Sequence, residues 1–151
     1  MKYLSIDSST VCCGYAEYDD NKLVKYGNYK SKNKDVLERM YELVTALSSH
    51  FKENQVLVIE EPSFIRINPS TSLKLNRLFG MILYEAHIAG LTVISVNPKS
   101  WKQKMLTTKK RVEQKLEAIE LSNKIFNINI TSNDTADAIL IGKYYIEKEE
   151  S

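Results

Sequence analysis

The sequence has little cysteine, and its two cysteines, Cys12 and Cys13, are adjacent. Neighbouring cysteines are poor partners for a disulfide, and the sequence has neither a disulfide framework nor the spacing of zinc ligands. A chain without disulfides is typical of reducing compartments, so we expect an intracellular, cytoplasmic protein.

Long apolar runs are missing as well. No stretch reaches the roughly 18 apolar residues that a membrane-spanning helix needs, and the first residues lack the basic-then-apolar pattern of a secretory signal peptide. We therefore expect no membrane partner. Repeats, linkers and low-complexity tracts are also absent, so residues 1–151 are expected to form a single domain.

The composition is that of a globular domain. Hydrophobic residues make up 43% of the chain and charged residues 26%, which argues against disorder. A domain of this length buries about two-thirds of its unfolded surface. It therefore needs neither a disulfide nor a structural metal to fold. The net charge of +2 is too small to indicate a partner.

The order of the predicted elements indicates one mixed α/β sheet of five strands with helices on both faces. Turn-forming residues, Asp19 to Asn21 among them, separate the first three strands and predict an antiparallel start. Apolar periodicity gives the remaining elements. The predicted strands cover residues 3–7, 12–18, 23–29, 55–60 and 91–96, and the predicted helices cover residues 34–51, 71–89, 98–105, 112–126 and 134–148.

The predicted helix over residues 71–89 carries apolar residues on two faces. Leu78 and Ile82 belong to one stripe, whereas Tyr84 and Ile88 belong to a second. One stripe would pack on the sheet, and the other indicates a further packing partner. Ser70 or Thr71 is expected to cap this helix.

Four carboxylates occupy the ends of predicted elements. Asp7 and Glu60 end strands, while Asp134 and Asp137 open the last helix three residues apart, on one face. Carboxylates are costly to bury without a partner, and a divalent cation removes their mutual repulsion. Oxygen ligands favour Mg²⁺ or Mn²⁺. Two such ions about 3.5–4 Å apart can activate water and stabilise the leaving oxygen of a phosphodiester.

Each of these acids also has an ordinary structural interpretation. An Asp after a strand is commonly a turn or cap residue, and Asp134 could simply favour a helix dipole. Glu61 follows Glu60 directly, which leaves the role of Glu61 open. Strand alternation puts Glu60 on the face of Val58 and turns Glu61 away, so we favour Glu60 as the ligand.

Short motifs recur in a characteristic order along the chain. They are LSID (4–7), CGY (13–15), VIE (58–60), VNP (96–98) and DTADA (134–138). This ordered set resembles the RuvC family of Holliday-junction resolvases, within the ribonuclease H-like superfamily. The sequence departs from the family where Ser8 and Ser9 replace the frequent Pro-Gly after the first acid, which changes the turn.

The resemblance implies a single RuvC-like nuclease domain, a crossover junction endodeoxyribonuclease of DNA recombination and repair. Its catalytic and metal-binding acids would be Asp7, Glu60, Asp134 and Asp137, with two Mg²⁺ or Mn²⁺ ions per site. It also implies a homodimer, with the helix over 71–89 near the two-fold axis. The short chain is typical of virus-borne members, which points to a phage-encoded protein.

Branched DNA, above all a four-way junction, would then be the partner. Lys102, Lys109, Lys110 and Arg111 belong to a basic stretch, and such residues bind phosphates in a salt-sensitive way. A solvated helix face is the plain alternative. Trp101 is expected to pack in the core.

The loop with Phe64 and Arg66 is the second predicted DNA-binding surface. The resemblance suggests that Phe64 wedges into an opened junction, where contacts to the deformed DNA offset the unstacking. Phe64 could equally anchor its loop to the core.

Three other functions stay open. A ribonuclease H-like nuclease acting on flaps or RNA–DNA hybrids would use the same acids, and a non-catalytic branched-DNA-binding module would share the fold. The segment from Asp7 to Gly14 also resembles the phosphate loop of sugar kinases and actin-like ATPases, but those enzymes enclose ATP between two such domains.

Overall fold

One mixed sheet forms the centre of the computed structural model, which describes residues 1–63 and 68–151. The strand order is β3-β2-β1-β4-β5. β1 pairs with β2, and β2 with β3, in antiparallel fashion, whereas the β1–β4 and β4–β5 pairs are parallel. The predicted five-stranded sheet is confirmed. The strands are β1 (Lys2–Asp7), β2 (Cys12–Asp19), β3 (Lys22–Lys30), β4 (Val56–Glu60) and β5 (Thr92–Val96).

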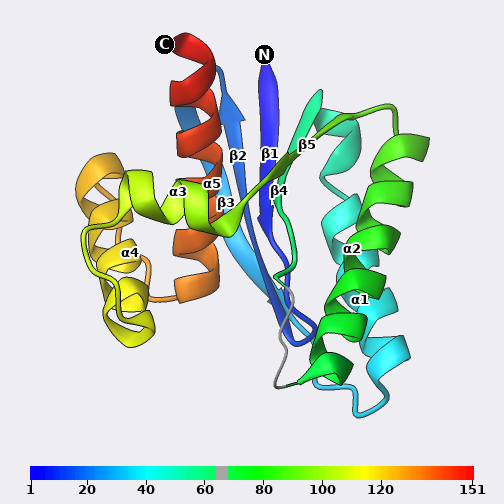
Figure 1. Cartoon of the computed structure of the whole chain (residues 1–151). Helices are drawn as coiled ribbons and strands as arrows, with labels where there is room; N and C mark the ends of the chain where they lie inside the picture. The colour runs from blue at the N-terminus through cyan, green and yellow to red at the C-terminus, as the bar shows by residue number, and fades with distance from the viewer. Residues whose placement is uncertain (64–67) are drawn as a thin grey trace.

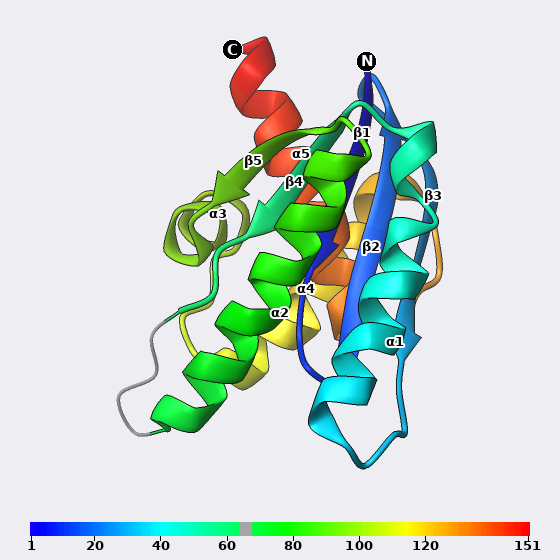
Figure 2. The same ribbon diagram turned by 90° about the vertical axis from the view of Figure 1, so that its right-hand side faces the viewer.

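Helices cover both faces of the sheet, as predicted. α1 (Val36–Ser48) and α2 (Pro69–Ile88) pack on one face, and α5 (Asn133–Glu150) packs on the other (Figures 1 and 2). α3 (Pro98–Met105) and α4 (Arg111–Phe126) lie beyond α5 on that second face. Within the described ranges, no helix combines the length and apolarity needed to cross a bilayer.

The first helix is shorter than expected. The Asp35 side chain accepts a hydrogen bond from the Glu38 backbone N–H at 2.9 Å, so α1 begins after Asp35 rather than at Lys34. It ends at Ser48, and Phe51 lies in a separate 3₁₀ turn (Phe51–Glu53). Phe51 is still buried with the apolar residues of α1, which explains why the apolar period seemed to continue.

The second helix begins earlier than expected. Asn68, not Ser70 or Thr71, is the N-cap, and its side chain accepts the Thr71 backbone N–H at 3.2 Å. Pro69 occupies the first helical turn, where its fixed φ favours the helix and its missing N–H costs nothing.

Alternation along the strands sends side chains into two separate cores. Leu4 and Ile6 of β1 are fully buried among residues of α1 and α2, whereas Ser5 between them faces α5. β4 follows the same rule, since Leu57 and Ile59 join the first core while Val56 and Val58 join the α5 side. Residues that continue the Ser5 and Val58 faces therefore point toward α5.

α5 lies unusually close to β1 and β2. The Ser5 hydroxyl donates to the Ala138 carbonyl, and the Tyr18 hydroxyl donates to the Ile139 carbonyl, both at 2.6 Å. A Cβ on Gly142 would lie 2.6 Å from both Ser5 Oγ and the Tyr18 ring. The missing side chain and the two hydrogen bonds together hold α5 on the sheet.

We expect opposite effects from alanine at two helical glycines. Gly142→Ala should destabilise the protein by about 1–3 kcal/mol, because the added methyl clashes with Ser5 and Tyr18. Gly80→Ala, with nothing within 4 Å of the new Cβ, should stabilise it by up to about 1 kcal/mol through helix propensity. Urea unfolding of both variants checks this, and similar midpoints for the two would contradict it.

Candidate active site

The strand register brings two of the four predicted acids together. Ile6 of β1 lies beside Ile59 of β4, so Asp7 and Glu60 end neighbouring parallel strands. Asp134 and Asp137 enter from the first turns of α5. All four acids line one pocket of about 420 Å³. The structure therefore gathers every acid that the sequence singled out.

A glycine allows the first turn of α5 to reach this pocket. Gly14 of β2 pairs with Asp7, and a Cβ on Gly14 would lie 1.9 Å from the Asp134 carbonyl oxygen. Any larger residue would push Asp134 away from the strand ends. The Gly in the CGY motif therefore has a structural reason: it admits the backbone of α5 beside β2.

Polar side chains fix the start of α5 further. Ser132 caps the helix by accepting the Thr135 backbone N–H at 3.4 Å, and the Asn28 amide donates to the Thr135 hydroxyl at 3.1 Å. The Asn133 amide donates to a carboxylate oxygen of Asp137 at 3.3 Å. Asp134 lies in the first turn, where the helix dipole favours a negative charge.

Desolvation and mutual repulsion make these acids hard to ionise together. The pKa of Asp7 is well above its usual range, because the side chain is desolvated and because Asp137 and Glu60 are negative. Burial likewise raises the pKa of Glu60, and burial followed by the charge of Glu60 raises the pKa of Asp137 to about 7. The positive charge of Lys102 opposes all three shifts.

The donor atoms of the pocket suit a divalent cation, although the side chains are not placed as a formed metal site. Across residues 1–63 and 68–151, no group of three or more His, Cys, Asp or Glu side chains is placed so that it could hold a metal ion. The acids nevertheless supply only oxygen donors, share one pocket and repel one another. Hard cations such as Mg²⁺ and Mn²⁺ prefer such ligands and would offset the repulsion.

Glu60 and Glu61 take different positions. Glu60 is half-buried and lines the pocket, whereas Glu61 is exposed and its backbone N–H donates to the Val96 carbonyl at 2.9 Å. This matches the alternation that favoured Glu60. Trp101 is completely buried, as expected of a packing residue, but its indole Nε1–H also donates to Glu60 Oε2 at 2.5 Å. The sequence did not suggest this contact, and the one available signal was a lone tryptophan directly before Lys102.

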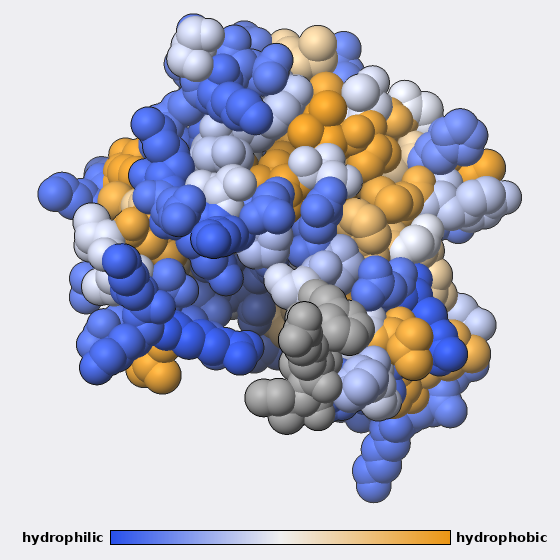
Figure 3. All heavy atoms as spheres, viewed as in Figure 1, coloured by the Kyte–Doolittle hydropathy of each residue, from blue (hydrophilic) through white to orange (hydrophobic). Residues whose placement is uncertain are grey.

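The predicted cations divide into two sets. Lys102 and Arg111 line the pocket together with Lys115, which is not among the predicted DNA-binding residues. Lys109 lines an adjoining pocket that Lys102 shares, and Lys110 is an exposed residue preceding α4. Hydrophilic side chains over α4 lie beside a hollow at the lower left of Figure 3. The predicted residues Phe64 and Arg66 lie outside the described residues.

Glu117 holds the basic segment between α3 and α4. The backbone N–H and hydroxyl groups of both Thr107 and Thr108 donate to its carboxylate, at 2.5–3.0 Å. Although desolvation acts in the opposite direction, these hydrogen bonds lower the pKa of Glu117 to about 2. Glu117 therefore has a structural role: it fixes the backbone of Thr107 and Thr108, directly before Lys109 and Lys110.

The sheet order, the helices on both faces and the acids at the strand ends define a ribonuclease H-like fold with an acidic pocket. Residues 1–148 match the family DUF3882, described as Lactococcus phage M3 protein, and the chain belongs to that family.

Relatives and solved structures extend this assignment. The chain is 36% identical over 87 residues to the crossover junction endodeoxyribonuclease RuvC of Aliarcobacter butzleri, a match covering 54% of this chain and 56% of that protein. Thermus thermophilus RuvC in complex with a Holliday junction substrate superposes with a TM-score of 0.75 at 19% identity, over 100% of this chain and 96% of that one.

A fowlpox virus resolvase, solved with substrate Holliday junction DNA, superposes with a TM-score of 0.70 at 18% identity, over the whole of both chains. At such identities the structures establish a common fold. Together with the relative above, they confirm the resemblance to RuvC-like resolvases.

We expect the metal-free protein to lose stability as the pH rises. Asp137 has a folded pKa of about 7 against an ordinary 3.8, so its folded form binds a proton that the unfolded chain releases. This stabilisation is complete below the unfolded pKa and is lost as the pH rises through about 7. Calorimetric unfolding in EDTA should therefore give a higher Tm at pH 5 than at pH 8.

Asp137→Asn should weaken this pH dependence and raise the metal-free Tm at pH 8, since the amide carries no charge to repel Glu60. Adding Mg²⁺ at pH 8 should raise the Tm of the unsubstituted chain. The exposed Asp19→Asn change is the matched control and should alter neither result. An unchanged pH dependence in Asp137→Asn would contradict the assignment of the shift to this pocket.

Proposed function

We propose that this protein is a metal-dependent endodeoxyribonuclease that resolves Holliday junctions and related branched DNA by paired phosphodiester hydrolysis. The observation that carries the proposal is the single pocket in which Asp7, Glu60, Asp134 and Asp137 lie beside Lys102. The fold shared with resolvases that were solved with junction DNA supports the choice of substrate.

In this mechanism the four acids hold Mg²⁺ or Mn²⁺, two ions per site. When bound, such a pair supplies an activated water and stabilises the leaving oxygen of the phosphodiester. Asp7 and Glu60 contribute from the rigid ends of β1 and β4, while Asp134 and Asp137 contribute from the capped start of α5. Lys102, on the same pocket, partly neutralises the scissile phosphate.

The cations on the α3–α4 side bind the DNA backbone. Arg111 and Lys115 line the pocket, Lys109 lines an adjoining pocket that Lys102 shares, and Lys110 is exposed directly before α4. Phosphate contacts of this kind give affinity and register without reading the base sequence.

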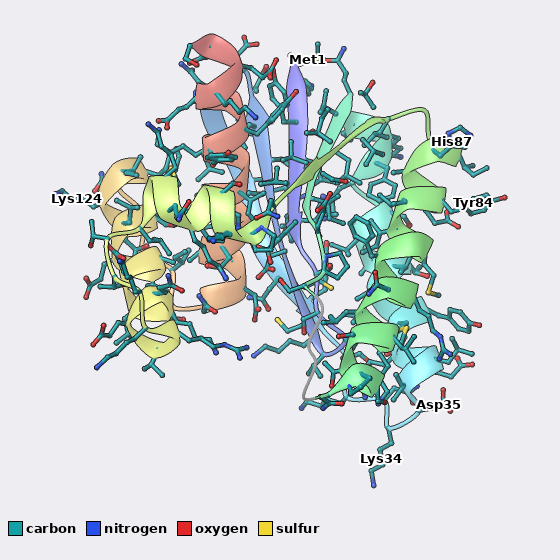
Figure 4. All side chains as sticks on the ribbon, in the orientation of Figure 1. Met1, Lys34, Asp35, Tyr84, His87 and Lys124 are labelled. Atoms are coloured by element: carbon teal, nitrogen blue, oxygen red, sulfur yellow. The ribbon has the colours of Figure 1, made fainter. Side chains whose placement is uncertain are left out.

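A homodimer would put two such pockets on the two strands of a junction. The second apolar face of α2 supports it: Tyr84 is 63% and Ile88 65% exposed. Tyr84 and His87 project outward from α2, away from the sheet (Figure 4). The family's description as a phage protein supports a phage-encoded enzyme that works inside a bacterial cell.

The test is cleavage of an end-labelled four-way junction, beside linear duplex, flap and RNA–DNA hybrid controls. With Mg²⁺ we expect symmetric nicks on the junction, and with EDTA none. Asp7→Asn should lower the cleavage rate by more than about 100-fold. Loss of a residue that only hydrogen-bonds a metal ligand costs up to about that factor, whereas Asp7→Asn removes a ligand itself. Junction binding should persist, and Asp19→Asn should cut normally.

Other outcomes of this test would contradict the proposed function or indicate a different one. Normal cutting by Asp7→Asn would contradict the assignment of the acids. Cutting of the flap or the hybrid with the junction spared would indicate a ribonuclease H-like nuclease for another substrate. Tight junction binding without cutting of any substrate would indicate a non-catalytic module.

Arg111→Gln should weaken junction binding in Ca²⁺ several-fold and lower the slope of log K against log salt by about 1, since one phosphate contact is lost. Lys124→Gln is the matched control on the same helix, because Lys124 points away from the pocket side (Figure 4). Titrations at several salt concentrations measure both variants. Equal slopes for the two variants would remove Arg111 from the DNA-binding surface.

A further inference from the structure

The indole of Trp101 is bonded to one of the pocket acids from within the core. Its exposed fraction is 0%, and its Nε1–H donates to Glu60 Oε2 at 2.5 Å. The ring packs among apolar residues of β4, β5 and α5, including Val58 and Leu140. A group held this firmly can hold its partner firmly in turn.

Local structure fixes the direction of this indole. Asn97 caps α3 by accepting the backbone N–H groups of Lys99 at 2.9 Å and Ser100 at 3.3 Å. Pro98 starts the helix, and the Trp101 backbone N–H donates to the Asn97 carbonyl at 3.3 Å. Trp101 therefore lies in the capped first turn of α3, which directly follows β5, and the end of β5 is paired with the end of β4.

The chemistry of an indole suits the orientation of a carboxylate ligand. An indole N–H only donates, so it binds a carboxylate oxygen without adding a ligand of its own. One oxygen of Glu60 is engaged in this way, which leaves the second for a cation. Outer partners that orient carboxylate ligands commonly govern metal affinity.

We propose that Trp101 is a positioning residue, which holds one oxygen of Glu60 so that the other is presented to a divalent cation in the pocket. This contact also commits Glu60, and not the exposed Glu61, to the pocket. The inference rests on the proposed function in that Glu60 serves as a metal ligand.

The first test uses the single tryptophan of the chain, which gives one indole cross-peak in a ¹H–¹⁵N spectrum. Glu60→Gln should move this cross-peak, because it replaces a charged acceptor by a neutral one. Glu61→Gln, at the neighbouring exposed position, should leave it in place. A cross-peak that moves with Glu61→Gln and not with Glu60→Gln would overturn the inference.

The second test measures Mn²⁺ affinity by electron paramagnetic resonance, without DNA. Trp101→Phe should weaken Mn²⁺ binding by about 10- to 100-fold. Because this change also alters packing, Trp101 is replaced in parallel by benzothienylalanine, which keeps the ring shape and substitutes sulfur for the N–H. That analogue should show the same loss while its unfolding midpoint stays near that of the unsubstituted chain.

Ile94→Ala is the packing control, since Ile94 is a partly buried apolar residue that packs against the same core. It should lower the unfolding midpoint and leave Mn²⁺ affinity unchanged. Unchanged affinity in the benzothienylalanine protein would overturn the role of Trp101 and leave the proposed nuclease intact. Reduced affinity in that protein, with no DNA substrate cut by the unsubstituted chain, would support Trp101 and overturn the nuclease.

Discussion

The close packing of α5 on β1 and β2 is the constraint on which the candidate site depends. Two hydroxyl groups, from Ser5 and Tyr18, donate to helix carbonyls, and Gly14 and Gly142 remove the side chains that would hold helix and strands apart. The adjoining residues of α5 are fully buried against the sheet. The same contact that builds the core therefore brings two acids of the helix to the two acids at the strand ends.

Packing α5 on the sheet places the four acids close together, so their charges repel one another. Asp7, Glu60 and Asp137 all have raised pKa values, so the metal-free pocket opposes full ionisation. Lys102 and the start of α5 offset only part of this repulsion. Proteins commonly keep such unfavourable charge clusters where function needs them and stabilise the fold elsewhere. Here the apolar cores on the two faces of the sheet provide that stabilisation.

Much of this could be read from the sequence because it follows from short-range patterns. Period-two alternation is enough to assign the faces of β4, and hence to prefer Glu60 over its neighbour. The starts of α1 and α2 were misplaced because Asp35 and Asn68 cap them, and several polar residues nearby were equally plausible caps. The bond from Trp101 to Glu60 spans 41 positions of sequence, so only the tertiary fold could reveal it.

The positions of the basic residues in the sequence do not predict which of them line the pocket. Lys110 and Arg111 are adjacent, yet only Arg111 lines the pocket, because α4 starts between them and fixes the direction of each side chain. Glu117 ties the preceding segment to α4. The acids are thus carried by the sheet and α5, and the cations by α3, α4 and the segment between these two helices. Because separate elements carry the two sets, loss of a carboxylate leaves the cationic surface in place, so the proposed nuclease can lose hydrolysis and keep its affinity for DNA.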